Sequence, residues 1–125
     1  MKGLLLDTHA LLWWRGDYRR IGTLVREEIA NPEVAVFFSV ASVWEIAIKR
    51  AKGKLDVPEN LLDTMGQRGF SELPVFSRHA LLAGALPRHH ADPFDRMLIA
   101  QARSEGLTLV TGDERIAAYG VPVLW

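Results

Sequence analysis

The chain contains no cysteine in its 125 residues. This absence excludes disulfide bonds, thiolate zinc sites and cysteine nucleophiles. Long hydrophobic runs are also missing. The opening run of three leucines ends at Asp7, far short of the roughly 18 apolar residues that a membrane span needs. We therefore expect no signal peptide and no membrane helix, and the lack of cysteine fits a cytoplasmic protein.

An excess of charge of one sign is missing as well, because 15 Lys and Arg residues balance 15 Asp and Glu residues. Cationic contacts supply most non-specific affinity for nucleic acids, so this balance neither supports nor excludes a nucleic-acid partner. The sequence also has no glycine-rich phosphate loop and no Ser-His-Asp pattern. What it does have is 49% hydrophobic residues, enough to build one folded domain over residues 1–125.

Apolar segments of strand length alternate with helical segments along the chain. Strands are expected over residues 2–6, 34–38, 72–76, 107–111 and 121–124. Helices are expected over about 9–14, 21–30, 59–67 and 77–85, from Ser39 to about Lys52, from Asp92-Pro93 to Gly106, and briefly from Asp113. Continuous apolar strands separated by helices predict an α/β fold, a three-layer α/β/α domain with a central, mainly parallel sheet.

Four acidic residues stand where this alternation brings them together. Asp7 and Asp113 each close an apolar run that is expected to be a buried strand, and Glu45 and Asp95 lie in largely apolar helices. Carboxylates in such places must be paired, protonated or bound to a metal. In parallel sheets, ligands bind at the carboxyl ends of the strands. If the four converge there, they form an oxygen-rich site suited to Mg²⁺ or Mn²⁺.

Each acid also has a structural explanation. Glu45 could complete a capping box with Ser42 or pair with Lys49 one turn later. The other acids stand where helix N-termini favour them: Asp7, Asp92, Asp95 and Asp113. We favour the functional interpretation, because otherwise four unrelated acids would fall near one face by chance.

Other residues are weaker candidates. Thr8 and Thr111 could bind a phosphate oxygen or a water on a metal, or act as caps. His89 and His90 could touch a metal or phosphate, but a surface or helix-entry position is favoured for both. Among the tryptophans, Trp44 is expected in the core. Trp13 and Trp14 are adjacent on a helix, so one of them is expected to be exposed or in an interface.

The chain resembles the PIN-domain ribonucleases, and especially the VapC-type toxins of type II toxin–antitoxin systems. The resemblance covers nearly the whole chain and is carried by the segments LLLDTHALLWW, SVASVWEIAIK, HHADPFDRMLIAQA and LTLVTGDERI, in that order and spacing. It implies a central parallel sheet between helices. The acidic positions of the family fall on Asp7, Glu45, Asp95 and Asp113, with Asp92 as a possible auxiliary member.

This resemblance implies that the acids bind Mg²⁺ or Mn²⁺ and that the chain is an endoribonuclease, cleaving RNA phosphodiester bonds with metal-activated water. It also implies a homodimer and inhibition by a small cognate antitoxin protein. Lys49 and Arg96 are hypothetical contacts to RNA phosphates. Two alternatives stay open: a non-catalytic PIN-like interaction module whose acids are caps and salt bridges, and a nuclease of the same fold acting on DNA or in RNA processing. A phosphoacceptor receiver domain needs a late lysine, and no lysine follows Lys54.

Overall fold

The computed structural model describes residues 3–57 and 59–125. Its strands form one five-stranded sheet in the order β3-β2-β1-β4-β5, and every pairing in it is parallel. The strands are β1 Leu4–Leu6, β2 Val36–Ser39, β3 Ser71–Leu73, β4 Thr108–Val110 and β5 Val123–Leu124. They are shorter than expected, and residue 2, where the first predicted strand began, lies outside the described residues.

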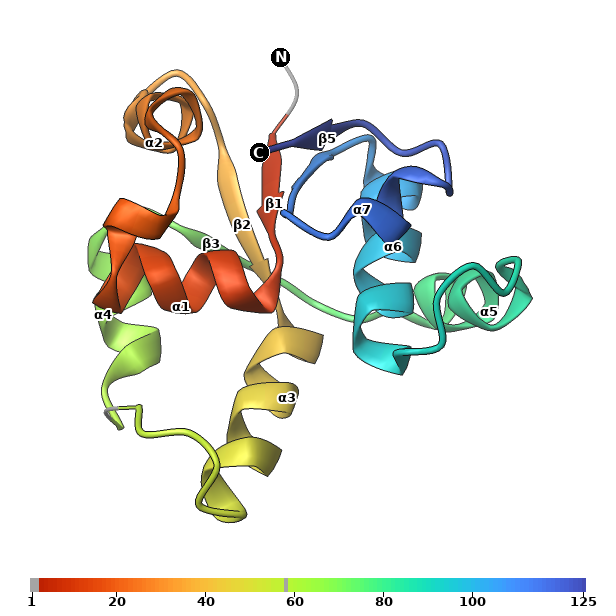
Figure 1. Cartoon of the computed structure of the whole chain (residues 1–125), viewed down its shortest axis with the longest axis horizontal. Helices are drawn as coiled ribbons and strands as arrows, with labels where there is room; N and C mark the ends of the chain where they lie inside the picture. The colour runs from red at the N-terminus through yellow and green to blue at the C-terminus, as the bar shows by residue number, and fades with distance from the viewer. Residues whose placement is uncertain (1–2, 58) are drawn as a thin grey trace.

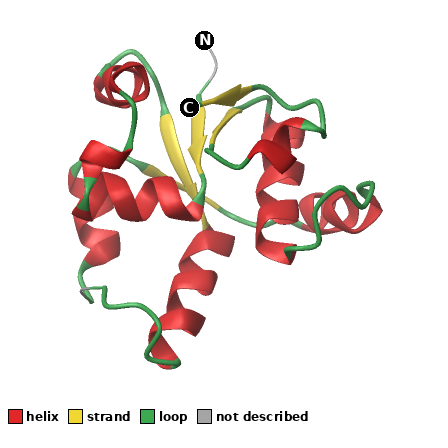
Figure 2. Cartoon of the chain, in the orientation of Figure 1, coloured by secondary structure: helices red, strands yellow, loops and turns green. Residues whose placement is uncertain are grey.

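Helices cover both faces of this sheet (Figures 1 and 2), so the predicted three-layer α/β/α architecture is confirmed. The helices are α1 Thr8–Gly16, α2 Thr23–Ala30, α3 Val40–Ala51, α4 Leu61–Gln67, α5 Ser77–Ala85, α6 Pro93–Glu105 and α7 Glu114–Ala117, with a 3₁₀ turn at Tyr18–Arg20 that was not predicted. No helix among the described residues is both long enough and apolar enough to cross a membrane.

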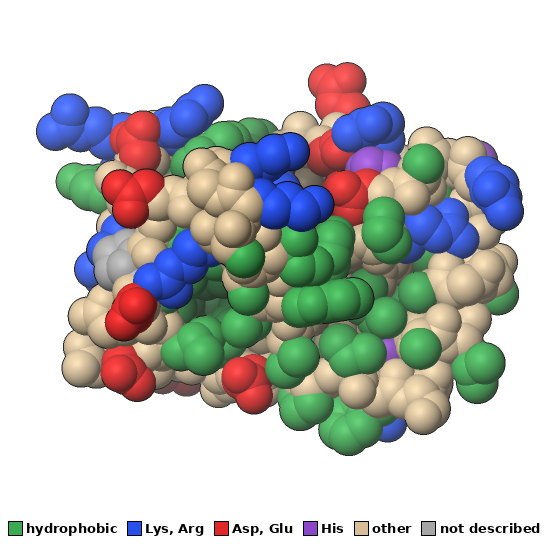
Figure 3. Space-filling model, turned by 90° about the horizontal axis from the view of Figure 1, so that it is seen from below, with side chains coloured by type: hydrophobic (Ala, Val, Ile, Leu, Met, Phe, Trp, Pro, Cys, Tyr) green, Lys and Arg blue, Asp and Glu red, His purple; other side chains and the backbone are tan. Residues whose placement is uncertain are grey.

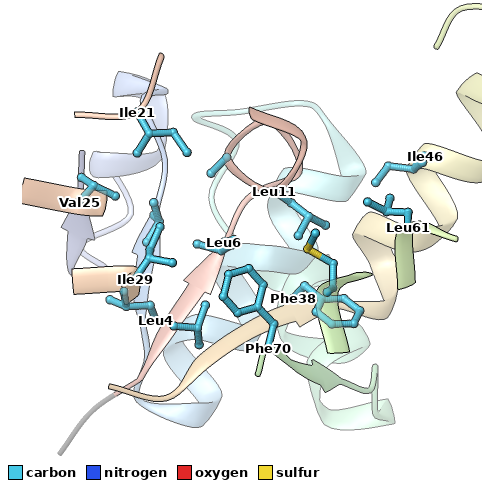
Figure 4. Close-up of a cluster of buried hydrophobic side chains, with 14 of the residues drawn as sticks. Leu4, Leu6, Leu11, Ile21, Val25, Ile29, Phe38, Ile46, Leu61 and Phe70 are labelled. Carbon is cyan, nitrogen blue, oxygen red and sulfur yellow. The ribbon is translucent and has the colours of Figure 1, made fainter. Parts of the chain in front are cut away.

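The central strand β1 divides its leucines between two hydrophobic cores, because successive side chains of a strand point to opposite faces. Leu4 and Leu6 pack with residues of α1, α2, α3 and α4, in the cluster that Figure 4 shows. Leu5 packs on the other face with residues of α6 and α7. Burying one leucine fully contributes about 1.5–3 kcal/mol, so this short strand is a main source of the stability that holds both layers.

Polar caps turn the chain from strand to helix at the carboxyl edge of the sheet. Ser39 ends β2, and its Oγ accepts the N–H of Ala41 at 2.9 Å, so the predicted cap of α3 is confirmed. At the C-terminus of α6, Gly106 adopts a φ of 69°, a left-handed conformation that favours glycine. Because the N-termini of α1, α3 and α7 follow strand ends, functional side chains on these turns gather at one edge of the sheet.

The tryptophans do not lie where the sequence suggested. Trp44 is 63% exposed on α3 and makes an edge contact with Phe94 at a centroid distance of 5.4 Å, so the expectation of a core position was wrong. Trp13 and Trp14 are both partly buried against the core, so neither is the exposed member of the pair. Trp13 packs on Trp125, and this aromatic contact with the chain terminus has no signature in the local sequence.

Candidate functional site

The candidate site lies where the strand order changes direction, beside β1. The chain adds β2 and β3 on one side of β1 and then returns to add β4 and β5 on the other side. In open parallel sheets this point leaves a crevice at the carboxyl ends of the strands, where ligands bind. Asp7 follows β1 directly, and its backbone N–H donates to Val110 O of β4 at 3.0 Å.

Five carboxylates line one pocket in this crevice, together with two cationic side chains. The carboxylates are those of Asp7, Glu45, Asp92, Asp95 and Asp113, and the cations are Lys49 and Arg115. Seen from below, acidic, basic and histidine side chains gather beside a broad hydrophobic area (Figure 3). The structure therefore brings the four acids singled out from the sequence, and the auxiliary Asp92, around one space.

Asp7 is buried, with only 5% of its surface exposed. Its Oδ1 accepts the N–H of Ala10 at 2.7 Å, so it does cap α1 as the structural explanation proposed. Burial raises the pKa of Asp7 above its usual value, although hydrogen bonds from the Thr111 hydroxyl and the Ala10 N–H act in the opposite direction. Capping of α1 therefore engages Oδ1 of Asp7. Burial near other acids still disfavours the charged form of this carboxyl group.

Glu45 is held from two sides. The buried Thr8 hydroxyl donates to Glu45 Oε1 at 2.7 Å and lies 3.0 Å from Ser42 Oγ, one turn earlier on α3. Lys49 Nζ donates to Glu45 Oε2 at 2.8 Å, so the predicted pairing across one helical turn is present. The capping-box alternative is wrong, because α3 begins at Val40 and Ser39 is its cap. Thr8 therefore fixes the direction in which Glu45 faces the pocket.

Asp92 and Asp95 both lie at the N-terminus of α6, as its N-cap and in its first turn. Asp92 Oδ1 accepts the N–H groups of Phe94 and Asp95 at 2.8 and 3.1 Å, which is the predicted N-cap. Asp95 points into the pocket, and its pKa is raised from 3.8 to about 6, first by burial and next by the charge of Asp92. Burial and the charge of Asp92 outweigh the opposite effect of His90 on this pKa, so Asp95 is a favourable position for a positive ligand.

Asp113 is the most strongly compensated acid. Its Oδ1 accepts from the backbone N and the Nε of Arg115 at 3.0 and 3.1 Å, and its Oδ2 accepts from Arg115 Nη2 at 2.9 Å. His90 Nε2 lies 3.1 Å from the same Oδ2. The hydrogen bond from the Arg115 side chain is the main reason that the pKa of Asp113 is lowered to about 2. Thr111 Oγ1 accepts the N–H of Asp113 at 3.1 Å, so this hydroxyl links Asp113 to Asp7.

His89 is exposed as expected, and His90 lies at the entry to α6, where its Nδ1 accepts the N–H of Asp92, but the expected surface position of His90 was wrong. His90 is buried, and its Nε2 lies 2.9 Å from Asp95 Oδ2 as well as 3.1 Å from Asp113 Oδ2. One ligand atom from each of these three residues lies within 4.8 Å of the others. Nothing in the local sequence distinguishes His90 from His89, because the groups that surround it come from distant segments.

The structure does not bring Arg96 to the acids. Its Nη1 donates to the carbonyls of Pro87 and His90 at 2.9 and 3.3 Å, and its Nη2 donates to those of Ala83 and Leu86, both at 2.8 Å. A guanidinium that satisfies four carbonyls holds the α5–α6 connection in place and is not available to a phosphate. The hypothesis that Arg96 contacts RNA is therefore contradicted. Arg115, which was not among the candidates, is the arginine at the pocket.

The donor set of the pocket fits a hard divalent cation. Five carboxylates face one lysine and one arginine, and burial together with mutual repulsion raises the pKa values of Asp7 and Asp95. Carboxylate oxygens are the ligands that Mg²⁺ and Mn²⁺ prefer. A cation bound among them relieves the repulsion that raises those pKa values.

Comparison with known proteins agrees with this geometry. The family model of the PIN domain matches residues 4–122. The chain belongs to the PIN domain family. A curated relative of this PIN domain is Ribonuclease VapC22 of Mycobacterium tuberculosis (strain ATCC 25618 / H37Rv), which is 28% identical over 126 residues, covering 98% of this chain and 95% of the relative.

Solved structures share the fold over nearly the whole PIN domain. The DNA-bound VapBC structure from Salmonella typhimurium superposes with a TM-score of 0.72 at 20% identity, covering 99% of this chain and 98% of the other. VapBC2 from Rickettsia felis, bound to a DNA fragment from its promoter, gives a TM-score of 0.74 at 15% identity, covering 97% and 96%. At these identities the likeness establishes the fold alone.

Proposed function

We propose that this PIN domain is a metal-dependent endoribonuclease and the toxin of a toxin–antitoxin pair. The observation that carries the proposal is the group of five carboxylates, two of them buried, that shares one pocket at the carboxyl edge of the sheet, where the pKa values of Asp7 and Asp95 are raised. A ribonuclease among its relatives, similar over almost the full length of both chains, supports RNA as the substrate. A non-catalytic interaction module has no need to gather this excess of negative charge in one pocket.

Asp7, Asp95 and Asp113 are the residues we propose as metal ligands, with Glu45 completing the set directly or through water. Mg²⁺ or Mn²⁺ is the expected ion, because all these ligands are carboxylates. When bound, such an ion activates water and offsets the negative charge that develops on a phosphodiester during cleavage. The protein prepares the site by holding Glu45 through Thr8.

The cations at the pocket have a second use in this proposal. Lys49 is about half exposed at the rim, with 43% of its side chain accessible, and Arg115 is 65% exposed. Both pair with carboxylates of the pocket, so they stand within reach of a phosphate that enters it. We propose Lys49 as a contact to RNA phosphate, with Arg115 taking the place that Arg96 cannot fill.

The partners follow from the proteins that share the fold. Several solved structures with this fold are VapBC complexes, so we propose a small cognate antitoxin and a homodimeric toxin. Exposed apolar surface is available beside the site, where Trp44, Val75, Phe94 and Met97 line a hollow of about 410 Å³ between α3 and α6. Light scattering of the purified chain, with and without a coexpressed antitoxin, measures both associations.

RNA cleavage by the purified chain, free of any copurified inhibitor, tests the proposed activity. We expect cleavage of a mixed RNA panel with Mg²⁺ or Mn²⁺, none with chelator, and little or none of a matched DNA panel. Asp7→Asn keeps the size of the side chain but removes its negative charge, so cleavage should fall by about 100-fold or more. Asp63→Asn, on the exposed surface of α4, is the matched control and should cleave like the parent chain.

The results also separate the alternatives. Cleavage of DNA in preference to RNA would favour the DNA-directed nuclease. Absence of cleavage on every substrate, together with no metal-dependent rise in melting temperature, would favour the interaction module, since tight metal binding must stabilise the folded state.

A further inference from the structure

His90 is the one histidine in the described ranges 3–57 and 59–125 whose ring lies between two carboxylates of the pocket. Its side chain is 3% exposed, and Nε2 faces Asp95 Oδ2 at 2.9 Å and Asp113 Oδ2 at 3.1 Å. These acids come from the first turn of α6 and from the cap of α7. A single ring nitrogen of His90 therefore links the N-terminus of α6 to the N-terminus of α7.

The other ring nitrogen decides which role His90 can play. Nδ1 accepts the backbone N–H of Asp92 at 3.2 Å, so in the neutral ring Nδ1 carries the lone pair and Nε2 carries the proton. A metal ligand at Nε2 would need the opposite tautomer, with Nδ1–H directed at the N–H of Asp92. Two donors would then face each other. The geometry therefore makes His90 a hydrogen-bond donor to the acids and disfavours it as a metal ligand.

The backbone of His90 is anchored independently of its ring. Its N–H donates to the Tyr119 hydroxyl at 2.8 Å, and that hydroxyl donates to Pro87 O at 2.8 Å. Its carbonyl accepts from Arg96 Nη1 at 3.3 Å. These bonds hold the segment before α6 whatever side chain stands at position 90. A change of the ring is therefore a clean test of what its nitrogens do.

We propose that His90 is a positioning residue of the acidic centre, whose Nε2–H bridges Asp95 and Asp113 and holds one oxygen of each carboxylate in place. The other oxygen of Asp95 is then presented to a divalent cation, at a set distance from Asp113 Oδ1, which also accepts from the backbone N and Nε of Arg115. Groups that hydrogen-bond to metal ligands typically change metal affinity or activity by 10–100-fold when they are removed. This inference rests on the proposed metal-dependent nuclease and adds to it a residue that orients the ligands without contacting the metal.

Two substitutions separate the functions of the two ring nitrogens. His90→Asn retains an acceptor near the Nδ1 position for the Asp92 N–H but has no donor that reaches the acids. His90→Gln places an amide N–H near the Nε2 position and so keeps a donor toward Asp95 and Asp113. Both proteins are stripped of metal and titrated with Mn²⁺ in a calorimeter without RNA, and the Mn²⁺ concentration for half-maximal RNA cleavage is measured alongside.

We expect His90→Asn to weaken Mn²⁺ binding by about 10-fold or more and to shift the Mn²⁺ requirement of cleavage equally, with the rate largely restored at saturating Mn²⁺. His90→Gln should stay within about threefold of the parent chain in the same titration, since it keeps the donor. Equal losses in both variants would overturn the donor role, because a metal ligand or a general structural residue behaves that way. Unchanged Mn²⁺ affinity with a slower rate at saturation would also overturn it, by placing His90 on the RNA.

The parent chain provides the remaining comparison. If it binds Mn²⁺ and both variants bind equally well, the positioning role fails while the proposed metal centre stands. If the parent chain itself binds no Mn²⁺, the metal centre fails and this inference fails with it.

Discussion

Replacing Asp95 by asparagine should stabilise the metal-free protein near neutral pH while it abolishes cleavage. Asp95 has a pKa of about 6 in the folded protein, against 3.8 as its ordinary value, mainly because it is buried and next because Asp92 is close. This rise in pKa corresponds to about 3 kcal/mol. Ionised Asp95 thus opposes folding above pH 6, and Asp95→Asn removes the charge that causes the opposition.

The sign of the effect fixes its pH dependence. A carboxyl group whose pKa is raised in the folded state contributes stability that is fully present below about pH 3.8 and is lost as the pH rises through about 6. The stability gained by Asp95→Asn should therefore be largest above pH 7, at up to about 3 kcal/mol, or on the order of 10 °C in melting temperature. It should shrink toward zero as the pH falls to 4.

Urea unfolding of both proteins in chelator, from pH 4 to pH 7.5, measures this difference directly. Asp56→Asn, an exposed change outside the pocket, controls for the general effect of removing one negative charge. A variant that is no more stable than the parent chain at pH 7.5, or a gain that does not change with pH, would refute the reasoning. The same experiment with Mn²⁺ should reverse the order, because the parent chain alone gains binding energy from the metal.

Two further predictions concern the ion pairs of Glu105, at the end of α6, and of Arg115, at the pocket. Glu105 accepts from His79 Nε2 and Arg78 Nη2, both at 2.8 Å, and these bonds, that from His79 first, lower its pKa to about 2. Glu105→Gln should therefore lower stability near pH 7, and urea unfolding should show the deficit closing as the pH falls from about 4.5 to about 2. Arg115→Gln removes a positive charge beside Asp113, so calorimetry should show Mn²⁺ binding strengthened by up to about fivefold; weaker binding would mean that Arg115 helps to form the site.

The arrangement of the acids was largely predictable, because each of them is attached to a local feature. Asp7 and Asp113 follow apolar runs, and in a parallel sheet such ends share one edge. Asp92 precedes a proline and an apolar helix, which is a cap signature in any fold. In each case a short stretch of sequence determines the strand end or helix cap, and the parallel topology of the sheet brings these ends to one edge.

His90 and Arg96 were misjudged for the opposite reason. The partners of His90 are Asp95, five residues later, and Asp113, 23 residues later, and the second meets the ring only once α6 and α7 have packed. Arg96 was a plausible phosphate contact from the sequence, but in the structure its guanidinium donates to one carbonyl at the end of α5 and to three in the loop before α6. Trp44 was misjudged because a largely apolar helix was taken to be buried on most sides, including that of Trp44, whereas α3 leaves the side of Trp44 exposed.

The most direct test of the account is the location of a bound ion. A crystal of the purified chain grown with Mn²⁺ should show an anomalous difference peak in the crevice beside β1, within about 2.2 Å of oxygens from Asp7 and Asp95, with His90 still donating to the carboxylates. A peak at a different place, or ligation of Mn²⁺ by His90 Nε2, would contradict the account. Either finding would require a different role for the five carboxylates that the fold collects there.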